Sequence, residues 1–187
     1  SSTNWDAADA QAADAMKIGD KYLDQGKLYV AKFNADGTGT WIELSLSNAL
    51  IANFSNYKFA DYADICANTR LAGDAVGATK MDRPEWCSVN PANGEIYYSL
   101  TNNSNRNINP TGSSQLAPDS ANPRAYSDMK GSSEQKGNPN GHILRMREGS
   151  DGAGAVSFTW DVYLFAAEAS ADAAAPPRFF VRASFGA

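Results

Sequence analysis

The residues whose types and spacing best suit chemistry lie in one short segment, from Gly77 to Trp86. Arg83 and Glu85 stand two positions apart there, with Pro84 between them. Proline favours an extended conformation for the residue before it, and side chains two apart on an extended chain point to the same side. Arginine presents a planar fork that suits two phosphate oxygens, and glutamate offers a hard oxygen ligand for a metal ion. From residue chemistry alone, a solvated surface ion pair is the favoured interpretation, because charged side chains are usually solvated, and a site that binds an anion and a cation is the alternative.

Composition narrows the classes of protein that this chain can belong to. Its 187 residues, 43% of them hydrophobic, suffice for one ordinary globular domain or part of a larger one. The formal charge is −5 and no basic patch occurs, so we expect no nucleic-acid partner. No run approaches the roughly 18 apolar residues of a membrane helix, so we expect no membrane span.

Histidine and cysteine are too scarce for the common zinc sites. His142 is the only histidine, and Cys66 and Cys87 are the only cysteines, which excludes multi-histidine and cysteine-rich zinc centres. We expect His142 to be a structural hydrogen-bonding residue. The two cysteines form either a disulfide or a pair of free, buried thiols, and both alternatives stay open.

Hydrophobic periodicity and turn residues predict the elements that position these groups. Strands are expected at 27–33, 39–44, 86–89, 95–100, 142–147, 156–164 and 178–182, and helices at 5–23 and 59–76. Turns at Asn34–Gly37 and Pro91–Gly94 indicate hairpins. The sequence thus predicts a mainly β fold, an antiparallel meander with accessory helices, as in a propeller or a barrel.

The stretch 101–141 is rich in Asn, Ser, Pro and Gly and has no apolar period, which predicts a functional or disordered loop. At its start, Asn102 and Asn103 are candidates for hydrogen bonds to a substrate, or else turn formers. The segment Asn34–Gly39 is superficially like a calcium loop, but it lacks the full ligand sequence, and a hairpin turn is the favoured explanation.

An ordered set of short runs between residues 20 and 165 resembles the PhoX family of secreted bacterial alkaline phosphatases. The central runs are Thr69–Thr79, Met81–Trp86, Asn90–Tyr97 and Leu100–Ser104, flanked by Gly26–Phe33, Asp36–Gly39, Asn122–Arg124 and Gly141–Ile143. No one run is diagnostic; their order and spacing are specific.

The resemblance implies a β-propeller and a phosphomonoesterase with a cluster of ferric iron and calcium ions. It implies Arg83 as a substrate-binding and catalytic residue that contacts phosphate, and Glu85 as a catalytic, metal-bridging carboxylate. The cations would act as Lewis acids that orient the phosphate for in-line attack. Export in the folded state, and hence a periplasmic or secreted location, follows from the same resemblance.

Several family features are missing from the sequence. The Cys-Glu-Glu metal motif is absent, no acidic metal motif follows the strand around Trp160, and residues 178–187 do not resemble the family. We therefore interpret residues 1–187 as a single region, an incomplete portion of a larger β-propeller domain. Alone, it is expected to be inactive, with the remaining part of the same propeller as its partner. The alternatives are a non-catalytic truncated propeller module and a calcium-dependent propeller lactonase or esterase.

Overall fold

The computed structural model describes residues 6–11, 13–22, 26–130, 132–150, 154–167 and 180–182. The chain divides into two compact units, one made of Ser1–Val30 with Ile42–Ala78 and the other of Ala31–Trp41 with Thr79–Ala187. None of the helices in these ranges is long and apolar enough to cross a membrane.

The first unit carries the accessory helices. They are η1 (Ala7–Gln11), α1 (Ala15–Tyr22), α2 (Ala49–Ala52), α3 (Tyr62–Ala67) and α4 (Thr69–Ala75). Asp61 caps α3, because its carboxylate accepts a hydrogen bond from the Asp64 amide at 2.8 Å. The hydrophobic core of this unit is a cluster of buried apolar side chains: Leu44, Ile51, Phe59, Ile65, Ala72 and Val76.

The two long helices predicted from the sequence are each broken. The helix predicted at 59–76 is split into α3 and α4 at Asn68, whose side-chain amide donates to the Asp64 carboxylate at 2.7 Å. Such side-chain bonds offer the chain an alternative to helical pairing. In the described part of the helix predicted at 5–23, Asp14 accepts from the Met16 amide at 3.1 Å where α1 begins.

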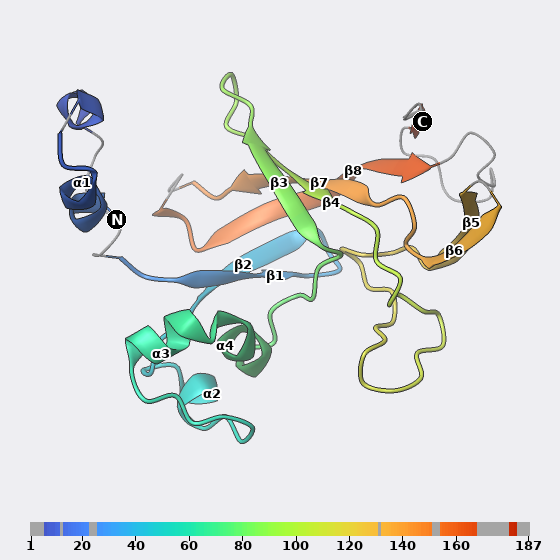
Figure 1. Ribbon diagram of the computed structural model, residues 1–187, viewed down its shortest axis with the longest axis horizontal. Helices are drawn as coiled ribbons and strands as arrows, with labels where there is room; N and C mark the ends of the chain where they lie inside the picture. Colours follow the sequence, from blue (N-terminus) through green and yellow to red (C-terminus); the bar gives the residue numbers. More distant parts are fainter. Residues whose placement is uncertain are drawn as a thin grey trace. The chain divides into compact units, whose positions relative to one another are not determined.

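A seven-stranded sheet dominates the second unit (Figure 1). The order of its strands is β1-β2-β8-β7-β4-β3, with β9 paired to β8 in parallel and the other described pairings antiparallel. Its members are β1 (Tyr29–Phe33), β2 (Thr38–Glu43), β3 (Pro84–Val89), β4 (Ile96–Leu100), β7 (His142–Glu148), β8 (Ser157–Ala167) and β9 (Phe180–Arg182). The prediction of a mainly β, antiparallel fold with accessory helices is confirmed.

A second, two-stranded sheet lies inside the stretch that was predicted to lack regular structure. It pairs β5 (Tyr126–Lys130) with β6 (Ser133–Gly137). The prediction that 101–141 lacks regular structure is therefore wrong for β5 and β6. It is confirmed for the connection between β4 and β5. Because β5 and β6 contain few apolar residues, backbone pairing rather than a hydrophobic pattern defines them.

The predicted hairpin turns are confirmed by their backbone geometry. Gly37 and Gly94 have φ of 83° and 72°, in the left-handed region that glycine adopts without a steric cost. Asp36 accepts from the Thr38 amide at 2.9 Å, so its carboxylate serves the turn. This favours the hairpin interpretation of Asn34–Gly39 over a calcium loop.

Strand β3 forms one end of the sheet order, next to β4 (Figure 1). All six of its residues are exposed, and Trp86 is 80% exposed. Packing instead lies under β4, β7 and β8, where Leu100 and Leu144 form a buried cluster with Ala121. The sheet thus holds the start of β3, and the site predicted there, on an open edge.

Candidate functional site

Arg83 and Glu85 come together at the start of β3. Their Nη2 and Oε1 atoms are 3.6 Å apart, and their side chains are 58% and 44% exposed. Asn102 accepts a 2.9 Å hydrogen bond from Nη1 of Arg83, and the Thr101 hydroxyl donates to Glu85 at 3.5 Å. The two side chains thus lie together, as expected from their spacing, although not on the extended backbone from which this was expected. The contact by itself is equally that of a solvated ion pair.

The backbone at Arg83 is not the extended one that was predicted. Its φ is 45°, and Arg83 is the only residue other than glycine with a positive φ in the described part of the chain. This conformation costs a residue with a Cβ atom about 1 to 2 kcal/mol. It is held because the Arg83 amide donates to the Met81 carbonyl at 3.0 Å and the Arg83 carbonyl accepts from the Thr101 amide at 3.2 Å. Backbone strain of this kind clusters at functional sites.

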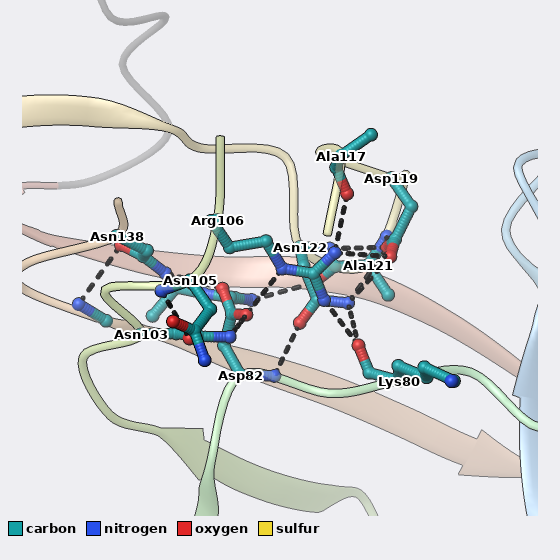
Figure 2. A network of polar contacts seen from close by, with 12 residues as sticks. Lys80, Asp82, Asn103, Asn105, Arg106, Ala117, Asp119, Ala121, Asn122 and Asn138 are labelled. Carbon is teal, nitrogen blue, oxygen red and sulfur yellow. Dashed lines mark hydrogen bonds and ion pairs between the residues drawn. The ribbon is translucent and has the colours of Figure 1, made fainter. Parts of the chain in front are cut away.

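Asp82, the residue before Arg83, is the buried centre of a group of polar side chains, all of them buried except the half-buried Asn103 (Figure 2). Its carboxylate accepts from Asn103 Nδ2 at 2.7 Å, Arg106 Nε at 2.6 Å and Asn138 Nδ2 at 3.0 Å. Its backbone amide donates to Asn122 Oδ1 at 2.8 Å. We call these five residues, together with His142, the polar hub.

His142 completes the polar hub as a neutral side chain. Its Nε2 lies 2.7 Å from the Ala121 carbonyl, which can only accept, so Nε2 carries the proton. Its Nδ1 then accepts from Asn138 at 3.1 Å. Burial lowers the pKa of His142 below its ordinary value of 6.5. The structure supports the expected structural role of this residue.

Arg106 is held on all sides by protein acceptors. Its side chain is 1% exposed, and Nη1 donates to the Ala117 carbonyl at 2.6 Å and to Asp119 at 3.1 Å, while Nη2 donates to the Lys80 carbonyl (Figure 2). Arg106 lines two hollows of about 500 and 390 Å³. Four of its five N–H donors have protein acceptors, so the guanidinium serves mainly to hold the fold.

The described residues do not by themselves make a metal cluster. Among them, no group of three or more His, Cys, Asp or Glu side chains is placed to hold a metal ion. Asp82 is already engaged by three donors, whereas Glu85 is exposed enough to supply one ligand oxygen. Cys66, in the first unit, and Cys87, in the second, are each an exposed free thiol, so the expectation of buried thiols is wrong.

Sequence reasoning missed the polar hub. It singled out Asn102 and Asn103, and the structure separates the two: Asn102 contacts Arg83, whereas Asn103 turns inward to Asp82. Asp82 and Arg106 were not singled out. The available signal was an acidic residue directly before the candidate arginine, in a chain with a long Asn-rich loop.

Comparisons with known proteins identify relatives for most of the chain. The family model described as "Alkaline phosphatase PhoX" matches residues 8–180. A solved structure, Pseudomonas fluorescens PhoX in complex with the transition-state analogue vanadate, is 37% identical with a TM-score of 0.55. The match covers 79% of this chain and 24% of that one. No curated protein matches.

Proposed function

This chain belongs to the PhoX family of alkaline phosphatases, and on that premise we propose that it contributes Arg83 and Glu85 to the active site of a metal-dependent phosphomonoesterase. Such an enzyme releases phosphate from organic phosphate esters. Because the chain spans 24% of the Pseudomonas PhoX chain, the activity belongs to a larger protein in this proposal. Residues 1–187 are then an incomplete portion of a β-propeller domain.

The observation that carries the proposal is the strained backbone of Arg83 beside a buried polar hub. A solvated ion pair needs neither a left-handed arginine nor a buried carboxylate directly before it. Arg83 combines a backbone held by hydrogen bonds with a side chain that is 58% exposed, so a phosphate can reach its guanidinium. Fixed donors of this kind stabilise charge that develops on the non-bridging phosphoryl oxygens.

Glu85 is the proposed metal ligand on this chain. Calcium and ferric iron both accept carboxylate oxygen, and the Glu85 carboxylate lies 3.6 Å from the Arg83 guanidinium. The remaining ligands would come from outside the described residues, since these hold no group of three candidate ligands. On this chain, the proposed roles are therefore phosphate binding by Arg83 and one ligand oxygen from Glu85.

The open edge of the sheet supports a further part of the proposal. Every residue of β3 is exposed, including Trp86 and Val89, and unpaired strand edges are normally covered or blunted. We propose that the remaining part of the same propeller covers this edge and completes the site. A periplasmic or secreted location is proposed from family membership.

The test of Arg83 is the hydrolysis of p-nitrophenyl phosphate by the protein purified from its source, with calcium and ferric iron supplied. Arg83→Lys should lower kcat/KM by about 100-fold, because lysine lacks the planar fork of fixed donors. Arg147→Lys is the matched control, an exposed arginine that bonds Glu95. Equal activities of the two variants would remove Arg83 from the site. Hydrolysis of lactones but not of phosphate esters would favour a propeller lactonase. Inactivity on both classes of substrate would favour a non-catalytic binding module.

The test of Glu85 is the metal content of the same protein. Glu85→Gln should lower bound calcium or iron, whereas Glu134→Gln, an exposed glutamate on β6, should not. Unchanged metal content and turnover in Glu85→Gln would refute the ligand role.

A further inference from the structure

Burying the charged pair of the polar hub contributes little to stability, so its presence calls for another role, such as holding one conformation of the chain. Asp82 and Arg106 are 0% and 1% exposed, and taking two charges out of water costs free energy that their attraction barely repays. Apolar side chains of similar volume would stabilise a core at least as well. What the charged pair adds is direction, because each hydrogen bond to a carboxylate oxygen has a fixed geometry.

The bonds of the polar hub converge on one short stretch of chain. Asn103 and Arg106 come from the connection after β4, Asn122 from further along it, and Asn138 from the turn before β7 (Figure 2). All of them contact Asp82, which leaves it no freedom to rotate. Asp82 is therefore the anchored end of the segment that enters β3.

Arg83 follows this anchor with no intervening residue. Its own carbonyl is tied to the Thr101 amide, and its guanidinium to Asn102. The backbone at Arg83 is thus held by the bonds of Asp82 on one side and by the Thr101 amide on the other. The left-handed φ of Arg83, 45°, is the conformation that connects these two held positions. A relaxed Arg83 would aim its side chain elsewhere.

We propose that Asp82 is a positioning residue: through the polar hub it forces Arg83 into the left-handed conformation that aims its guanidinium, together with Glu85, at the phosphoryl group. The inference rests on the proposed function for the identity of that group. The conformational part stands on the hydrogen bonds of Asp82 and Arg83 within this chain and is tested separately.

The test compares glycine with alanine at position 83, because glycine adopts positive φ without the steric cost that alanine incurs. With Asp82 intact, Arg83→Gly should have an unfolding equilibrium constant about fivefold smaller than Arg83→Ala. When Asp82→Asn is added, the segment around Arg83 can relax, and Arg83→Gly should no longer be more stable than Arg83→Ala. We call this difference in stability the glycine advantage. Glu95→Gln is the matched control, a buried carboxylate 4% exposed on the approach to β4, and it should leave the advantage intact.

Asn138→Ala is the second background, in case Asp82→Asn does not fold. It removes one donor to Asp82 and one to His142 while keeping the Asp82–Arg106 pair, so the advantage of glycine should shrink. An advantage that persists unchanged in either hub variant overturns the proposal. So does the absence of any advantage when Asp82 is intact.

Phosphatase assays on the same set of variants separate this inference from the proposed function. If the glycine advantage depends on Asp82 while Arg83→Lys retains full phosphatase activity, the hub positions Arg83 and the phosphate role is wrong. If both predictions hold, Asp82→Asn should also raise the KM for p-nitrophenyl phosphate with unchanged metal content, and Glu95→Gln should not.

Discussion

Replacing Arg106 by methionine would leave the carboxylate of Asp82 buried without its counter-ion. The two groups are 2.6 Å apart, and their side chains are 1% and 0% exposed. Removing one partner of a buried pair destabilises a protein by about 3 to 5 kcal/mol, because the other charge is left uncompensated. Asp82 would keep its bonds from Asn103 and Asn138, which places the expected loss toward the lower end of that range.

Arg145→Met is the matched control. Arg145 forms an ion pair with Asp161 across β7 and β8, but these side chains are 26% and 42% exposed. Partly solvated pairs of this kind contribute about 1 kcal/mol or less. The same substitution should therefore cost several times less on the sheet surface than in the polar hub.

Urea denaturation measures both losses, with tryptophan fluorescence and circular dichroism as the two probes. Coincident transitions from the two probes justify comparing free energies of unfolding. A loss below about 1 kcal/mol for Arg106→Met, or equal losses for the two variants, would refute the claim that the Asp82–Arg106 pair anchors the segment before Arg83.

Two further predictions concern the surroundings of the polar hub. Burial lowers the pKa of His142 below 6.5 in the folded protein. As the pH falls, the unfolded chain therefore binds a proton at this histidine before the folded chain does. The stability that neutral His142 contributes is complete above about pH 6.5 and is lost as the pH falls toward the folded pKa. The difference in unfolding free energy between wild type and His142→Gln should therefore change from pH 7.5 to pH 5, by at most about 1.4 kcal/mol per pH unit; a constant difference would contradict it. Gly137 has φ of 92°, and a Cβ there would lie 2.1 Å from the Asn103 carbonyl oxygen, so Gly137→Ala should destabilise by more than about 1 kcal/mol. The control Gly19→Ala has open space within a helix and should stabilise; equal effects on the melting temperature would refute the predicted clash.

Local signals explain what the sequence predicted well. The turn residues at Gly37 and Gly94 need only their own backbone to specify a hairpin, and both turns are present. The side chains of Arg83 and Glu85 do lie together, but the extended backbone from which this was expected is absent at Arg83. The preference imposed by Pro84 was overridden, because tertiary hydrogen bonds hold Arg83 in a conformation that its neighbour does not favour.

Long-range contacts explain what the sequence did not reveal. The partners of Asp82 lie 21 to 56 residues away in the chain, at Asn103, Arg106, Asn122 and Asn138. Nothing local distinguishes an asparagine that turns into a buried hub from one that forms a turn, since the same side chain serves both. The acidic residue before the candidate arginine became informative only when its burial was known.

The most direct measurement of the central claim is a crystal structure of the complete protein with vanadate or inorganic phosphate bound. We predict an anion oxygen within hydrogen-bond distance of the Arg83 guanidinium, a cation bound to Glu85, and a left-handed backbone at Arg83. An anion bound elsewhere, with Arg83 still engaged only by Glu85 and Asn102, would contradict the claim.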